Sequence, residues 1–188
     1  MVDLEAAGIR IVQVDEPALR EGLPLRSSRR PEYLAWAVEA FRLATSGVRD
    51  STQIHPHMCY SDFGDIIEAI MQMDVDVLSI EAARSDMGLL EEMSPGQYRN
   101  CIGPGVYDVH SPRIPACPEY EARIHRALMV FSPDQLWINP DCGLNTRSWK
   151  EIEPALRNMI IAARRIRMEL SQHHRAQALQ HREAALAS

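Results

Sequence analysis

Short apolar runs alternate along the chain with longer segments in which apolar residues recur at helical spacing. The short runs, rich in β-branched residues, predict strands, and the longer segments predict amphipathic helices. Strands are expected over residues 9–14, 52–59, 75–81, 102–110 and 135–140. Helices are expected over residues 30–48, 62–73, 86–93 and 117–131, and a long helix starts near Trp149 or Glu151 and runs past Leu170. Ser61 and Ser85 are expected to cap the second and third of these helices.

This alternation of strands and helices predicts the fold class. Strand-then-helix units in series predict parallel strands with right-handed crossovers, in either a doubly wound sheet or a (β/α)8 TIM barrel. A complete barrel takes roughly 250 residues, whereas this chain has 188. We expect an α/β fold of the barrel type that contains only the last five βα units, over residues 1–167. Residues 168–188 are polar and are expected to form a helical or disordered tail.

Composition narrows the classes of partner and the cellular compartment. A net charge of −6 without a basic stripe argues against nucleic acid and against a membrane surface as partners. No apolar run approaches the ~20 residues that a membrane span needs. The first ten residues lack the pattern of a signal peptide, so a cytoplasmic location is expected. In a reducing compartment the four cysteines are expected to be free or metal-bound rather than bridged.

Four residues of metal-binding type lie at or just past the ends of expected strands: His57, Cys59, Glu81 and Cys142. Two thiolates, one imidazole and one carboxylate are a chemically sensible zinc set. His57 and Cys59 are two residues apart and face the same side of an ideal strand. Spacing alone fits a buried histidine and two core cysteines equally well. His55 shares that face but lies deeper in the strand, which favours a supporting or core role.

Two further groups follow expected strands. Asp15, Glu16 and Glu21 follow the first one, where a carboxylate can accept hydrogen bonds from a substrate ammonium, although composition favours a solvated turn. Asp108 and His110 follow the fourth, two residues apart. A nearby carboxylate favours the protonated form of an imidazole, which would suit His110 as a general acid. On the residues alone, a histidine in a strand-to-loop turn is the favoured interpretation.

The segments that hold these residues resemble one known family. They are "VDEPALREGLPLR", "IHPHMCYSDF", "IEAARSDMGLLE", "GPGVYDVHSPRIP" and "LWINPDCGLNTR". In order and spacing they closely resemble the C-terminal barrel of cobalamin-independent methionine synthases, the 5-methyltetrahydropteroyltriglutamate–homocysteine S-methyltransferases. The resemblance runs from the start of the chain to the helix near Arg167, and the tail does not share it.

The resemblance implies a role for each matching residue. His57, Cys59, Glu81 and Cys142 match the family's zinc ligands. Asp15 matches the carboxylate that holds the homocysteine ammonium, Glu21 a folate-contacting position, and His110 the proton donor. The implied activity is zinc-dependent methyl transfer from 5-methyltetrahydropteroyl-polyglutamate to the thiol of homocysteine, which gives methionine.

The resemblance covers under a third of the family enzyme, without its N-terminal barrel or the first three units of this barrel. Two other functions are therefore considered: a truncated, non-catalytic zinc-binding remnant, and an oligomerising module. Sheet edges left unpaired in such a remnant are expected to promote self-association.

Overall fold

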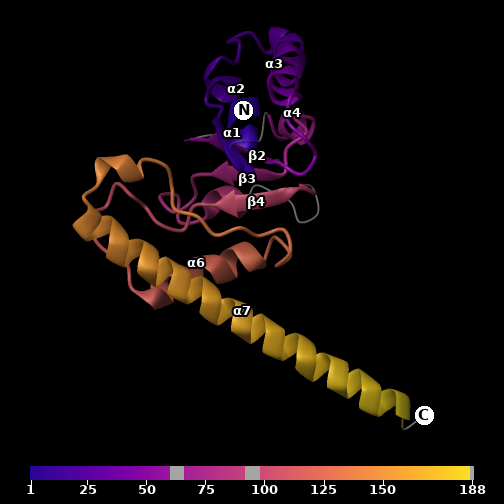
Figure 1. The fold of residues 1–188 in the computed structure, drawn as a ribbon, viewed down its shortest axis with the longest axis vertical. Coiled ribbons are helices and arrows are strands. Elements are labelled where there is room, and N and C mark those ends of the chain that lie inside the picture. Colours follow the sequence, from indigo (N-terminus) through magenta and orange to yellow (C-terminus); the bar gives the residue numbers. More distant parts are fainter. Residues whose placement is uncertain (60–65, 92–97, 187–188) are drawn as a thin grey trace.

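The computed structural model describes residues 1–59, 66–91 and 98–186. Its centre is a parallel four-stranded sheet in the order β1-β2-β3-β4 (Figure 1). The strands are β1 (Ile11–Asp15), β2 (Gln53–Met58), β3 (Val77–Ile80) and β4 (Cys101–Pro104). Each pairs with its neighbour along the chain, so the crossovers expected from the sequence are present.

Burial explains why these segments became strands. All residues of β2, β3 and β4 are buried or half-buried, as in a parallel sheet covered on both faces. β1 alternates instead: Val12 is buried, whereas Ile11 and Gln13 are exposed. One face of β1 is therefore open.

Helices cover the sheet and extend beyond it. α3 (Arg30–Thr45) and α4 (Ile67–Met71) lie on the β1 and β2 side, whereas α6 (Cys117–Leu128) and α7 (Trp149–Leu186) pack together beyond β4 (Figure 1). The short helices are α1 (Val2–Ala6), α2 (Ala18–Glu21), α5 (Gly88–Glu91), η1 (Ser27–Arg29) and η2 (Leu144–Thr146). Within the described residues, none of the helices combines the length and apolar character that a membrane span requires.

The strand expected over residues 135–140 is only partly formed. The segment runs parallel to β4 and touches it at two isolated bridges, Ile102 to Leu136 and Gly105 to Asn139. Trp137 donates its N–H to the carbonyl of Ile102 at 2.8 Å. The ladder breaks between the bridges because Pro104 has no N–H to donate. The segment nevertheless lies where a fifth strand would lie.

α7 is one continuous helix that includes the expected tail as far as Leu186. Its first half buries apolar residues at helical spacing: Ile152, Ala155, Met159, Ala162, Ala163 and Ile166. Beyond Leu170, the described side chains 171–173 and 175–177 are exposed, and this part of α7 projects away from the sheet (Figure 1).

Two serines were expected to cap helices. Ser61 lies outside the described residues. The hydroxyl of Ser85 donates to the carbonyl of Ala82.

Candidate metal centre

A cleft of about 470 Å³ opens at the carboxyl ends of β1, β2 and β3. Its lining includes Asp15, His57, Cys59, Ser79 and Cys142. Parallel strands deliver side chains to this rim because all of their carboxyl ends point the same way. A larger cleft of about 860 Å³ lies beside α3 and the amino ends of β2 and β3, but none of the described residues that line it is a histidine or a cysteine.

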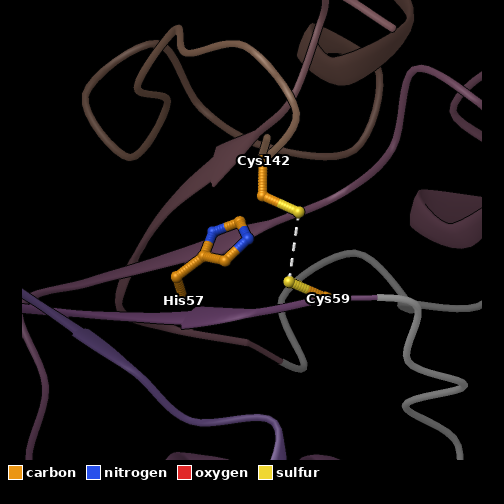
Figure 2. A group of neighbouring side chains, drawn as sticks. All are labelled: His57, Cys59 and Cys142. Atoms are coloured by element: carbon orange, nitrogen blue, oxygen red, sulfur yellow. Dashed lines mark hydrogen bonds between the residues drawn. The ribbon is translucent and has the colours of Figure 1, made fainter. Parts of the chain in front are cut away.

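Three predicted ligands converge in the smaller cleft. One ligand atom each from His57, Cys59 and Cys142 lies within 4.8 Å of the other two (Figure 2). The two sulfur atoms are 3.2 Å apart. Glu81, the fourth predicted ligand, lies beside them, because Sγ of Cys142 donates to its Oε1 at 3.1 Å. Residues more than 80 positions apart in the sequence, such as Cys59 and Cys142, thus share one site.

The environment of His57 suits a metal ligand. Its side chain is buried, and Nδ1 is 2.9 Å from the hydroxyl of Ser79. Within the described part of the chain, its buried Nε2 has no hydrogen-bond partner. Burial lowers the pKa of this imidazole, which favours the neutral form that binds metals. A buried nitrogen without a partner is costly, and a cation would satisfy it.

The surroundings of the two thiols disfavour the thiolate form when no cation is bound. Burial raises the pKa of Cys59 and of Cys142, and Glu81 adds to both effects. A bound divalent cation reverses this balance because it stabilises the thiolate directly. Two sulfurs, one imidazole nitrogen and an adjacent carboxylate are donors that fit zinc.

The other predicted residues lie at different distances from this centre. Asp15 ends β1 directly opposite His57 in the strand register and lines the cleft. Glu21 is the exposed last residue of α2, and its charge acts on the thiol of Cys59. His110 follows β4 in a half-exposed loop, where its Nδ1 is 3.2 Å from Oδ1 of Asp108. The structure therefore brings Asp15 to the predicted metal ligands, and His110 is not among the described residues that line the cleft.

Sequence reasoning missed three residues that lie around the predicted ligands: Ser79, Asn139 and Asp141. Nδ2 of Asn139 lies 3.4 Å from the hydroxyl of Ser79, which in turn contacts His57. Asp141 is only 1% exposed. Burial raises the pKa of its carboxyl to about 6. Two features of the sequence could have pointed to these residues. One is a polar residue inside the apolar run of β3, and the other is the "NPD" tripeptide before Cys142, which is typical of a turn. His55, the other histidine of β2, contacts Gln53 and the ring of Trp137 instead of the thiols.

Comparison with known proteins identifies similar sequences. The family model described as "Cobalamin-independent synthase, Catalytic domain" matches residues 1–165. A 5-methyltetrahydropteroyltriglutamate–homocysteine methyltransferase from Salinibacter ruber is 59% identical over 167 residues, which are 89% of this chain and 22% of the relative. One from Xylella fastidiosa (strain 9a5c) is 58% identical over the same shares. The chain thus spans about a fifth of the length of these curated relatives.

Solved structures of low sequence identity share the fold. A B12-independent methionine synthase from Shewanella sp. W3-18-1, in complex with selenomethionine, has a TM-score of 0.75 at 22% identity, and the match covers 91% of this chain and 52% of that one. A putative vitamin-B12-independent methionine synthase from Listeria monocytogenes has a TM-score of 0.67 at 20% identity, covering 86% and 50%. The predicted α/β fold of the barrel type, present here in part, is confirmed.

Proposed function

Because the chain belongs to the cobalamin-independent methionine synthase catalytic-domain family, we propose that it serves zinc-dependent transfer of a methyl group from 5-methyltetrahydropteroyl-polyglutamate to the thiol of homocysteine. One observation carries the proposal: His57, Cys59 and Cys142 converge beside Glu81, and the buried Nε2 of His57 has no partner among the described residues. This arrangement is what a thiol-activating metal centre needs.

The proposed zinc ligands are His57, Cys59, Glu81 and Cys142. When bound, zinc favours the deprotonated form of the homocysteine thiol at neutral pH. Two thiolates and a carboxylate limit the positive charge felt by that sulfur, which keeps it nucleophilic. Of these four residues, Glu81 would hold the ion least firmly, because carboxylates bind this metal less firmly than thiolates.

Asp15 is proposed to hold the ammonium group of homocysteine. Its carboxylate ends β1 beside His57, on the rim of the same cleft. A charge-assisted hydrogen bond there would fix the amino acid with its thiol directed toward the cysteines. Glu21, one short helix further along the chain, is proposed to contact the folate.

His110 is proposed to donate the proton that makes the folate amine a better leaving group. A methyl group on a tertiary amine is a poor electrophile, and protonation at N5 of the folate weakens the bond that breaks. Oδ1 of Asp108 contacts Nδ1 of His110, and the backbone N–H of His110 donates to the same oxygen at 2.9 Å. The contact at Nδ1 orients the ring, and the backbone hydrogen bond holds the carboxylate that makes this contact.

In a second candidate function, the chain binds zinc but does not catalyse methyl transfer. His110 does not line the described cleft. This observation favours a chain that binds zinc and transfers no methyl group.

One experiment separates these functions. The purified chain is loaded with zinc, its zinc stoichiometry is measured, and homocysteine is added while proton release and sulfur coordination are followed, the latter by X-ray absorption. The proposed activity predicts one zinc per chain, proton release and one additional sulfur neighbour. Bound zinc without a response to homocysteine supports the non-catalytic function. A folded chain that binds no zinc would falsify both.

A further inference from the structure

Asp141 precedes the proposed ligand Cys142 in the sequence and is one of the most deeply buried charged residues described, at 1% exposure. It follows the segment that runs beside β4 without forming a full strand. A buried carboxylate is expensive unless its hydrogen bonds repay the lost hydration. The partners of Asp141 therefore indicate what it does.

Those partners lie on the strand-end segment that carries another ligand. Oδ1 of Asp141 accepts the backbone N–H of Ala82 at 3.0 Å and that of Ala83 at 3.3 Å. Both amides directly follow Glu81 in the chain. The carboxylate thus ties the residue before one proposed ligand to the residues after another, across 58 and 59 positions of sequence.

We infer that Asp141 is a positioning residue of the metal centre, which fixes the segment of Glu81 against the segment of Cys142 by accepting the two amides after Glu81. The contact between the two ligands, 3.1 Å from Sγ of Cys142 to Oε1 of Glu81, is the geometry it maintains. This inference rests on the proposed zinc site.

The residue that follows β4, Gly105, leaves room for this contact. A Cβ placed on Gly105 would lie 2.7 Å from the backbone nitrogen of Asp141 and would overlap its Oδ1. Both are closer than real Cβ contacts allow, and a backbone atom cannot swing aside as a long side chain can. The N–H of Asp141 also donates to the carbonyl of Tyr107 at 2.9 Å. The missing side chain at Gly105 therefore lets Asp141 lie close against the end of β4 and reach the segment after β3.

The test measures metal binding in folded variants. Asp141→Ala removes the acceptor, and Asp141→Asn keeps an oxygen that can accept both amides. Asp76→Ala is the matched control, because Oδ2 of Asp76 also accepts a backbone N–H, that of Ile54 at 2.7 Å, at the far end of the same sheet. Zinc affinity is measured by chelator competition, and the thiolate-to-cobalt absorption of the Co²⁺-loaded chains reports ligand geometry.

The expected results are specific to the acceptor oxygen. Asp141→Ala should lower zinc affinity roughly 10- to 100-fold, as loss of a residue that orients a metal ligand typically does, and should alter the cobalt spectrum. Asp141→Asn should restore most of the affinity and the wild-type spectrum. Asp76→Ala should change affinity by less than about twofold even where it lowers stability, because its hydrogen bond is remote from the site. Gly105→Ala should resemble Asp141→Ala.

Two outcomes would overturn the inference. One is unchanged zinc affinity and an unchanged cobalt spectrum in Asp141→Ala. The other is an Asp141→Asn variant as impaired as Asp141→Ala, which would assign the effect to charge instead of the hydrogen bonds. If Asp141→Ala does not fold, Asp141→Asn and Gly105→Ala decide the question between them. Failure of the wild-type chain to bind zinc is a separate result, which would end the proposed function itself.

Discussion

At the residue scale, the protonation of the proposed metal ligands predicts how zinc binding depends on pH. Burial raises the pKa of Cys59 and of Cys142, so both thiols are protonated at neutral pH in the absence of a cation. Burial lowers the pKa of His57, so its imidazole is already neutral. Zinc binding near pH 7 should therefore release about two protons, both from the thiols.

This proton release makes zinc affinity rise with pH. Each unit of pH between about 6.5 and 8 should tighten apparent binding by up to about 100-fold, since two protons leave for each ion bound. Isothermal titration calorimetry in buffers of different ionisation enthalpy counts the protons directly. Affinity that stays constant across this range would contradict the assignment of both thiols as ligands.

Two cysteines of the chain form a matched pair for mutation. Cys142 lies 3.2 Å from Cys59 in the cleft, whereas Cys117 begins α6, outside the metal cluster. Cys142→Ser should lower zinc affinity by at least about 100-fold, because a hydroxyl is a poor substitute for a thiolate on zinc. Cys117→Ser should leave affinity within about twofold, since it changes no ligand. Chelator competition measures both, and equal effects would refute the ligand set.

What the sequence revealed of this site depended on residue type. Histidine and cysteine at strand ends are uncommon enough to stand out, so the candidate ligands could be singled out in the sequence, although their spacing alone fitted buried core residues equally well. Asp141 and Ser79 could not be singled out in this way. The partners of Asp141 are two backbone amides, and the partner of Ser79 is a side chain on another strand. An aspartate after proline and a serine in a strand have many ordinary explanations, and only the packing of three segments distinguishes among them.

At the element scale, α6 offers a test of local electrostatics. Glu119 in its first turn accepts the backbone N–H of Ala116 at 2.8 Å and pairs with Arg113 at 2.6 Å. The hydrogen bond from Arg113 and that from the amide of Ala116 lower the pKa of Glu119 from 4.5 to about 2. Because the pKa is depressed in the folded state, this carboxylate stabilises the fold above pH 4.5 and loses that effect as the pH falls toward 2.

Glu119→Gln should therefore destabilise the chain most at neutral pH. The side chain is 38% exposed, so solvent screening limits the expected loss to about 0.5–1 kcal/mol. Urea unfolding at about pH 7, 4.5 and 3.5 should show the difference from wild type shrinking as the pH falls. Glu153→Gln, which breaks only an exposed pair with Arg157, is the control and should cost about 0.3–0.5 kcal/mol. A Glu119→Gln deficit that does not vary with pH would contradict this interpretation.

The elements themselves were predictable to different degrees, for physical reasons. β2 and β3 are buried along nearly their whole length, and their apolar runs made them easy to find. The segment over 135–140 has an equally apolar sequence yet forms only isolated bridges. The cause lies in the neighbouring strand β4, where Pro104 has no N–H to donate to this segment. The start of α7 near Trp149 was predicted correctly, because apolar residues recur at helical spacing over a long segment.

At the scale of the whole molecule, the sheet face that carries the candidate metal centre is open at β1. On that face Gln13 of β1 is exposed, whereas His55 of β2 is buried. Within the described residues, β1 has a hydrogen-bonded neighbour strand only in β2, so it forms one edge of the sheet. The backbone N–H and C=O groups that face away from β2 leave this edge available to another chain.

The edge strand β1 predicts that the chain self-associates and that the contact between copies forms along β1. Ile11 is 47% exposed on this strand, and Ile9, just before it, is 45% exposed. An exposed strand with apolar residues is a template for pairing, and an inward-pointing charge is a common means of blocking such an edge. Sedimentation velocity should show association that grows with concentration and weakens in Ile11→Lys. The control is Leu43→Lys on α3, which adds the same charge at a residue 74% exposed and away from the edge. Equal association in wild type, Ile11→Lys and Leu43→Lys would exclude β1 as the contact, whereas unchanged zinc affinity in both variants would verify that the charge left the fold intact.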